Sequence, residues 1–140
     1  MTEKKARQRV TQEQVHIAYD TAKFIHDNPA QKTKQQGASE LHERYKINKG
    51  TANDFIRGFH HLMAGSVFKR ALSEYAMRHF LTGIQQDYGL SRLQQALSAL
   101  KKHIDYREEG DLDTGRKPVP QGAMRRVYDD YSKPTRPTQR

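Results

Sequence analysis

Three polar side chains at regular spacing are the first candidates for chemistry in this chain. Asn53, Arg57 and His61 follow one another at four-residue intervals, so an α-helix would place them along one face. Asn can pair with adenine and Arg with guanine, through two hydrogen bonds each, when a helix enters the major groove of DNA. The spacing therefore predicts a base-reading face. The alternative is an ordinary helical hairpin whose polar face meets water.

The residues around this face predict the unit that would position it. Residues 41–62 have the pattern of two short helices joined by a tight turn, which is the outline of a helix-turn-helix. Ile47 stands where such units fill the turn with an aliphatic side chain, and Asn48 tolerates turn backbone angles. Thr51 is the predicted N-cap of the second helix, and the carboxylate of Asp54 can answer it near the positive end of the helix dipole.

Lysine and arginine side chains flank the predicted unit. Contact with phosphate needs no fine geometry, so these cations are expected to bind the DNA backbone, and Thr51 to touch a phosphate in addition to its capping role. The predicted DNA-binding residues are Lys46, Lys49, Thr51, Asn53, Arg57, His61, Lys69 and Arg70.

The overall charge agrees with a polyanionic partner. Lys and Arg number 25 against 16 acids, which gives a net charge of +9, the electrostatic pattern of proteins that bind nucleic acid. No segment approaches the ~20 apolar residues of a membrane-spanning helix, and the basic start of the chain lacks the apolar core of a signal peptide. We therefore expect a cytoplasmic protein with no membrane partner. The absence of cysteine excludes disulfides, thiol catalysis and the cysteine-rich zinc fingers.

Hydrophobic periodicity predicts an all-α fold, a compact bundle of about five helices over residues 11–106. Thr11 and Gln14 predict a capping box at the first helix, and residues 31–37 a polar loop before a second helix at 38–45. The third helix is expected at 51–63, the central one within 66–88, and the fifth from Ser91. Residues 1–10 are expected to be a flexible basic arm. Residues 107–140 hold four of the five prolines and are expected to be a mostly disordered basic tail.

Metal and catalytic patterns are missing from the sequence. His60 and His61 are adjacent, so they point about 100° apart on a helix, and no His or acid stands at ligand-like spacing from them. The chain shows no Gly-rich phosphate loop, nucleophile elbow or acidic cluster of the nuclease type. We expect no metal, cofactor or catalytic residue here; nuclease catalysis, if any, would belong to another domain or partner.

The order of motifs over residues 45–106 resembles a known module. The successive stretches are YKINKGTANDFIRGFHHLMAG, SVFKRALSEYAMRHFLTGIQQDYG and LSRLQQALSALKKHIDY. They look like the all-helical module that precedes the catalytic domain in some bacterial HNH-type restriction endonucleases. The most specific parts are Gly50–Asp54, the Lys69-Arg70 pair, Asp87–Gly89 and Ala96–Ile104, and the likeness would cover residues 11–106.

The resemblance implies DNA recognition or positioning within restriction or another defence against foreign DNA. It also implies a nuclease domain or subunit as a partner. An HNH nuclease needs a His base, an Asn that orients it and a metal-binding His, and the residues after 106 do not provide them. An isolated module, a fragment of a longer nuclease and a stand-alone relative all stay open.

Two other functions stay open at this stage. One is a protein-interaction module, such as a regulator, inhibitor or antitoxin-like protein, that binds an acidic surface through partly exposed Tyr75, Tyr88 and the stripe Leu93, Leu97 and Leu100. The other is RNA binding, although neither an aromatic stacking platform nor a GxxG clamp is evident. A homodimer would suit a palindromic DNA site.

Overall fold

The computed structural model describes residues 10–70 and 72–133, and regular structure within these ranges is helical apart from one isolated bridge between Asp111 and Arg116. The predicted all-α class is confirmed, with six helices in these ranges where about five were expected. They are α1 (Gln12–Asp27), α2 (Lys34–Tyr45), α3 (Lys49–Ala64), α4 (Glu74–Tyr88), α5 (Leu90–Glu109) and α6 (Gly122–Ser132).

The first two helices begin at matching caps. The predicted capping box of α1 is confirmed, because Thr11 Oγ1 accepts the Gln14 N–H at 3.0 Å and the Gln14 side chain accepts the Thr11 N–H at 2.9 Å. Thr33 and Gln36 repeat the same exchange at α2. As a result α2 starts at Lys34, and most of the polar loop expected over residues 31–37 is helical.

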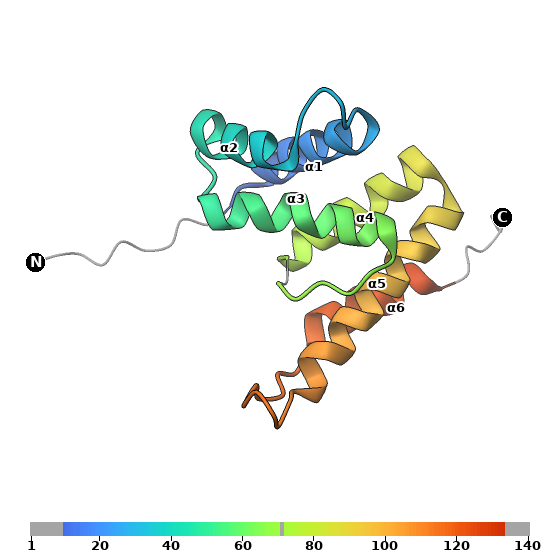
Figure 1. The fold of residues 1–140 in the computed structure, drawn as a ribbon. Helices are drawn as coiled ribbons and strands as arrows, with labels where there is room; N and C mark the ends of the chain where they lie inside the picture. The colour runs from blue at the N-terminus through green and yellow to red at the C-terminus, as the bar shows by residue number, and fades with distance from the viewer. Residues whose placement is uncertain (1–9, 71, 134–140) are drawn as a thin grey trace, which may run out of the picture.

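The helices form a layered bundle with α3 at its centre. Figure 1 shows α1 and α2 side by side along one flank of α3, with α5 crossing its other flank and α6 lying against α5. The core joins these layers through large side chains such as Phe59, Phe80 and Leu62, all of which are buried. The expectation that residues 66–88 form the central helix was wrong, because α3 takes that place between α1, α2 and α5.

The segment before α4 explains this difference. The helix begins only at Glu74, where the Ser73 hydroxyl accepts the Ala76 N–H at 3.1 Å. The preceding residues, 66–70 and 72, are not helical and bury Phe68 and Leu72 in the core. Gly89 ends α4 and directly precedes α5, so these two helices meet without a connecting loop.

The carboxyl-terminal part of the chain differs from the expected disordered tail. Residues 122–132 form α6, which buries Met124 and Val127 against α4 and α5. Polar contacts reinforce this packing, since Arg125 Nε donates to Glu108 at 2.8 Å. Helix α6 forms because its apolar residues recur every three or four positions and find a partner surface. Residues 1–9 of the expected arm and 134–140 of the expected tail lie outside the described residues.

None of the described helices combines the length and the apolar character that crossing a membrane requires.

Candidate nucleic-acid interface

The connection between α2 and α3 is a three-residue turn with fixed geometry. Lys46 adopts a left-handed backbone conformation with φ of 64°. The N–H of Ile47 then donates to the Leu41 carbonyl at 3.1 Å, which closes the end of α2. The Ile47 side chain is only 2% exposed, so the predicted aliphatic plug of the turn is confirmed. This plug holds the start of α3 against the end of α2.

Helix α3 is capped by Asn48, and the prediction that Thr51 caps it was wrong. Asn48 Oδ1 accepts the N–H groups of Gly50 and Thr51, at 2.9 and 3.3 Å. Both Asn and Thr are good caps, but the buried Ile47 places the start of the helix just after Asn48. Thr51 is therefore the third residue of α3, and Asp54 is not its capping partner.

The other end of α3 is tied down as well. Gly65 has φ of 70° and donates its N–H to carbonyls of the last turn, which is the usual role of glycine after a helix. Lys102 of α5 donates to the Gly65 carbonyl at 2.8 Å. His61 Nδ1 and the Ser66 hydroxyl are hydrogen-bonded at 2.9 Å, which leaves Nε2 of the imidazole for another partner.

Two grooves run along the exposed side of α3. The first, of about 460 Å³, lies between α3 and residues 67–70. The second, of about 790 Å³, lies between α3 and the amino-terminal half of α2. Asn53, Arg57 and His61 line both grooves, so the predicted common face of these three residues is present. We call this surface the basic face and define it by Lys34, Lys49, Asn53, Arg57, His60, His61, Lys69 and Arg70.

Six of the eight residues predicted from the sequence line these grooves, and two do not. Lys49 lies on the side of α2, while Lys69 and Arg70 lie on the opposite side of α3. Lys46 belongs to the turn and does not line either groove, although it is exposed. Thr51 is half-buried in the first turn of α3, about 200° around the helix from Asn53. The structure therefore brings together the central three residues and three of the flanking cations.

Sequence reasoning missed several residues of the two grooves. Lys34, Gln35 and Ser39 come from α2, whose start was expected four residues later. The Thr33–Gln36 capping box was the signal that would have placed Lys34 and Gln35 on a helix. His60, Asp54 and Gly50 are also lining residues, and they come from α3 itself.

The basic face has a strong local charge. Five Lys and Arg side chains line the grooves against a single acid, Asp54, which belongs to the first groove. Burial raises the pKa of Asp54, and the nearby Arg70 and Arg57 oppose that rise. The described residues that line the second groove include no acid. An anion approaching along α2 and α3 therefore meets an uncompensated positive field.

The two adjacent histidines are held close to neutrality. Burial lowers the pKa of both imidazoles, and the positive charge of Lys34 lowers each further. Arg57 adds to the effect on His61. These side chains therefore carry little charge near neutral pH, and a negative partner would favour their protonated forms.

The loop that carries Lys69 and Arg70 is fixed from α5. The Lys69 Nζ atom lies 5.7 Å from the centre of the Tyr106 ring, and the Arg116 guanidinium stacks on the same ring at 3.8 Å. Two cations thus share one aromatic side chain. Lys69 is consequently positioned at the rim of the first groove, where it remains exposed.

The comparisons with known proteins do not extend this description. No family model, curated protein or solved structure matches this chain. Within residues 10–70 and 72–133, no group of three or more His, Asp or Glu side chains is placed to hold a metal ion. The geometry of the basic face is therefore the basis for assigning a function.

Proposed function

We propose that the basic face binds double-stranded DNA, with α2 and α3 acting as a helix-turn-helix and α3 entering the major groove. The observation that carries this proposal is the row Asn53, Arg57 and His61 on α3 with cations on both sides of it. A single helix fits the ~12 Å width of the major groove. The cations beside the helix are then placed for the two phosphate backbones that border the groove.

Each side chain has a role suited to its chemistry. Arg57 can donate two hydrogen bonds to guanine, and Asn53 can pair with adenine in the same way. His61 can offer Nε2 to a base edge or a phosphate, because its Nδ1 is engaged with Ser66. Lys34 and Lys49 on one flank, and Lys69 and Arg70 on the other, supply phosphate contacts that set affinity rather than sequence preference.

Duplex DNA suits this surface better than RNA. The major groove of an A-form RNA helix is deep and narrow, so side chains on a helix such as α3 could not reach its bases. The proposed reading face lies on one helix between two grooves of the protein, so it requires an open nucleic-acid groove. Double-stranded DNA provides such a groove.

The resemblance to the helical module of HNH-type restriction endonucleases extends the proposal to a setting. In that setting the chain recognises or positions DNA for restriction or a related defence, and a separate nuclease domain or subunit cleaves it. The support for this extension is the order of motifs over residues 45–106. Catalysis is not assigned to this chain.

Fluorescence anisotropy with a labelled random-sequence duplex tests the binding proposal. The duplex is titrated at two salt concentrations beside the same duplex with methylated cytosine and an RNA duplex of equal length. Neutralising about six phosphates gives a slope of log K against log salt of about −5. Preference for duplex DNA with this slope is the expected result. Absence of binding even at low salt would overturn the proposal.

Alanine substitutions then locate the DNA-binding surface. Arg57→Ala should weaken binding by about tenfold or more, as loss of a bidentate contact does. The double change Lys69→Ala and Arg70→Ala should weaken it and also make the salt slope shallower by about two. Arg44→Ala is the matched control, because Arg44 is an exposed α2 cation that lines neither groove. Equal losses in the control and in Arg57→Ala would reject the basic face as the binding surface.

A further inference from the structure

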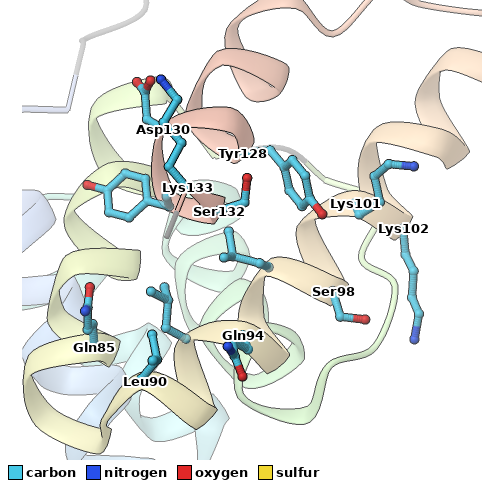
Figure 2. A pocket seen from close by; sticks show the side chains of 13 residues that line it. Gln85, Leu90, Gln94, Ser98, Lys101, Lys102, Tyr128, Asp130, Ser132 and Lys133 are labelled. Carbon is cyan, nitrogen blue, oxygen red and sulfur yellow. The ribbon is translucent and has the colours of Figure 1, made fainter. Parts of the chain in front are cut away.

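A third groove, of about 990 Å³, lies between the end of α4, α5 and α6. Figure 2 shows Tyr128 and Ser132 of α6 above Gln94 and Ser98 of α5, with the groove between the two helices. We call it the α5–α6 groove. It shares no lining residue with the two grooves of the basic face, so any ligand here would leave the basic face accessible.

The wall of this groove combines polar and apolar side chains, and leucines and tyrosines form its apolar part. Leu93 and Leu97 of α5 are buried beneath it, and Tyr128 and Tyr131 of α6 face it from the opposite side. Leu90, the first residue of α5, lies at the edge of the groove and is 53% exposed. Leu90, Tyr128 and Tyr131 together give the groove an apolar strip that a partner could cover.

The charges at the groove are not balanced. Lys101 is paired with Asp105 at 3.2 Å, and Asp130 is paired with Arg78 at 2.9 Å. Lys102 donates to the Gly65 carbonyl, and among the described residues neither Lys102 nor Lys133 has an acidic partner. Two uncompensated cations therefore border the leucine and tyrosine side chains, which favours an occupant that carries both apolar and acidic side chains.

Neither the terminal segments of this chain nor a second copy of it has the negative charge that the groove favours. Residues 1–9 hold four cations and one acid, a net charge of +3, and residues 134–140 hold two cations and no acid, a net charge of +2. A second copy would bring a net charge of +9. Each of these would place further positive charge against Lys102 and Lys133.

We propose that the α5–α6 groove docks an acidic amphipathic peptide segment of a partner protein. Leucine or aromatic side chains of the segment contact Leu90, Tyr128 and Tyr131, and its carboxylates lie at Lys102 and Lys133. A groove of this size matches ordinary binding sites, and an amphipathic helix laid into a groove is a common mode of peptide recognition. The chain would thereby connect a partner to whatever the basic face binds, and the docking itself does not depend on DNA.

The test uses the full-length chain and a fluorescein-labelled peptide of about 16 residues with leucines at helical i, i+3, i+4 and i+7 spacing and glutamates elsewhere. A second peptide has every glutamate replaced by lysine. The acidic peptide should bind saturably, and the lysine peptide about tenfold or more weakly. Leu90→Ser and Lys133→Glu should each weaken the acidic peptide about fivefold or more. Lys133 is preferred to Lys102 because Lys102 also holds the Gly65 carbonyl.

Matched controls come from surfaces away from the groove. Leu112→Ser removes a leucine that is 100% exposed, and Lys117→Glu reverses an exposed lysine that does not line the groove. Neither should change peptide affinity. Absence of saturable binding, equal binding of the lysine peptide, or equal losses in the controls would overturn the proposal. Self-association that Leu90→Ser abolishes would also overturn it, since a second copy would then be the occupant. DNA binding is measured in separate titrations, so its failure would be seen independently.

Discussion

The Nδ1 atom of His103 lies 2.7 Å from the backbone oxygen of Phe68, and the two rings stack with their centres 4.3 Å apart. Because a carbonyl only accepts, Nδ1 carries the proton and donates it. The Nε2 atom is buried without a hydrogen-bond partner among the described residues. His103 is thus a neutral imidazole inside the protein that fastens the segment before Lys69 and Arg70 to α5.

Replacing this imidazole should destabilise the fold. His103→Leu keeps most of the volume but leaves the Phe68 carbonyl without its donor, which costs about 1–3 kcal/mol when the group is buried. His42→Leu is the control, because His42 also hydrogen-bonds a main-chain carbonyl, that of Ile47 at 2.9 Å, but is exposed to water. Urea unfolding should show a clear loss for His103→Leu and less than about 1 kcal/mol for the control. Equal losses would show that burying this hydrogen bond does not increase its contribution to the free energy of unfolding.

Acid should weaken the fold through the same residue. Burial is the main cause that lowers the pKa of His103 below its ordinary value of 6.5, and Arg107 adds to it, while the Phe68 hydrogen bond opposes it. Burial and His16 likewise lower the pKa of His79. The unfolded chain therefore binds protons that the folded chain does not, so the free energy of unfolding falls as the pH drops below the ordinary value.

Urea unfolding at about pH 7.5 and pH 5.5 measures this loss, in a range where most carboxylates stay ionised. The wild-type protein should be less stable at the lower pH. The free energy of unfolding of His103→Leu should fall less between these two pH values, since one titrating group has been removed. A wild-type protein whose stability rises on acidification would contradict the assignment of His103 and His79 as neutral in the folded protein.

Local spacing was sufficient to predict the helical class and the centre of the proposed interface. Asn53, Arg57 and His61 share a face because a four-residue interval on one helix depends on no other part of the chain. The turn plug at Ile47 was predictable for the same reason. The N-cap was not, because Asn48 and Thr51 are both suitable caps and tertiary burial of Ile47 decides between them.

The elements that could not be predicted depend on distant partners. Helix α6 has a short apolar stripe, but what makes it pack is the surface of α4 and α5, including Arg78, which pairs with Asp130 at 2.9 Å. Lys69 reaches its place because its loop is held by α5, far along the sequence. Neither packing relationship can be read locally, so the proline content and polar composition indicated a tail at α6, and apolar periodicity indicated a longer helix before α4.

DNA binding should strengthen on acidification, in contrast to folding stability. The pKa values of His60 and His61 are lowered in the free protein by burial and by Lys34, with smaller contributions from His26 and Arg57. A phosphate near either imidazole would raise its pKa, so the complex binds protons that the free protein lacks. Affinity should therefore rise as the pH falls from about 7.5 to 6, by at most about tenfold per pH unit for each proton.

The double variant His60→Gln and His61→Gln measures their share of this effect. Its DNA affinity should change less with pH than that of the wild type, in anisotropy titrations at constant salt. His42→Gln, which changes an exposed histidine that lines neither groove, should keep the wild-type pH dependence. A double variant with an unaltered pH profile would place both imidazoles away from the bound phosphates.

Two glycines inside helices should respond to alanine in opposite directions. A Cβ at Gly83 of α4 would lie 2.5 Å from Cζ of Tyr19. That ring is buried, and its hydroxyl donates to Asp87 at 2.8 Å, so it cannot move aside without losing this bond. The atoms nearest to a Cβ at Gly58 of α3 would belong to the Leu72 side chain, at an ordinary 3.5 Å.

Gly83→Ala should therefore lower the free energy of unfolding by about 1–3 kcal/mol, as overpacking does. Gly58→Ala should raise it by up to about 1 kcal/mol, because alanine is the better helix former and nothing obstructs it. Urea unfolding of the two variants beside the wild type gives both values, and a shift of the same sign in both would contradict the close packing at Tyr19.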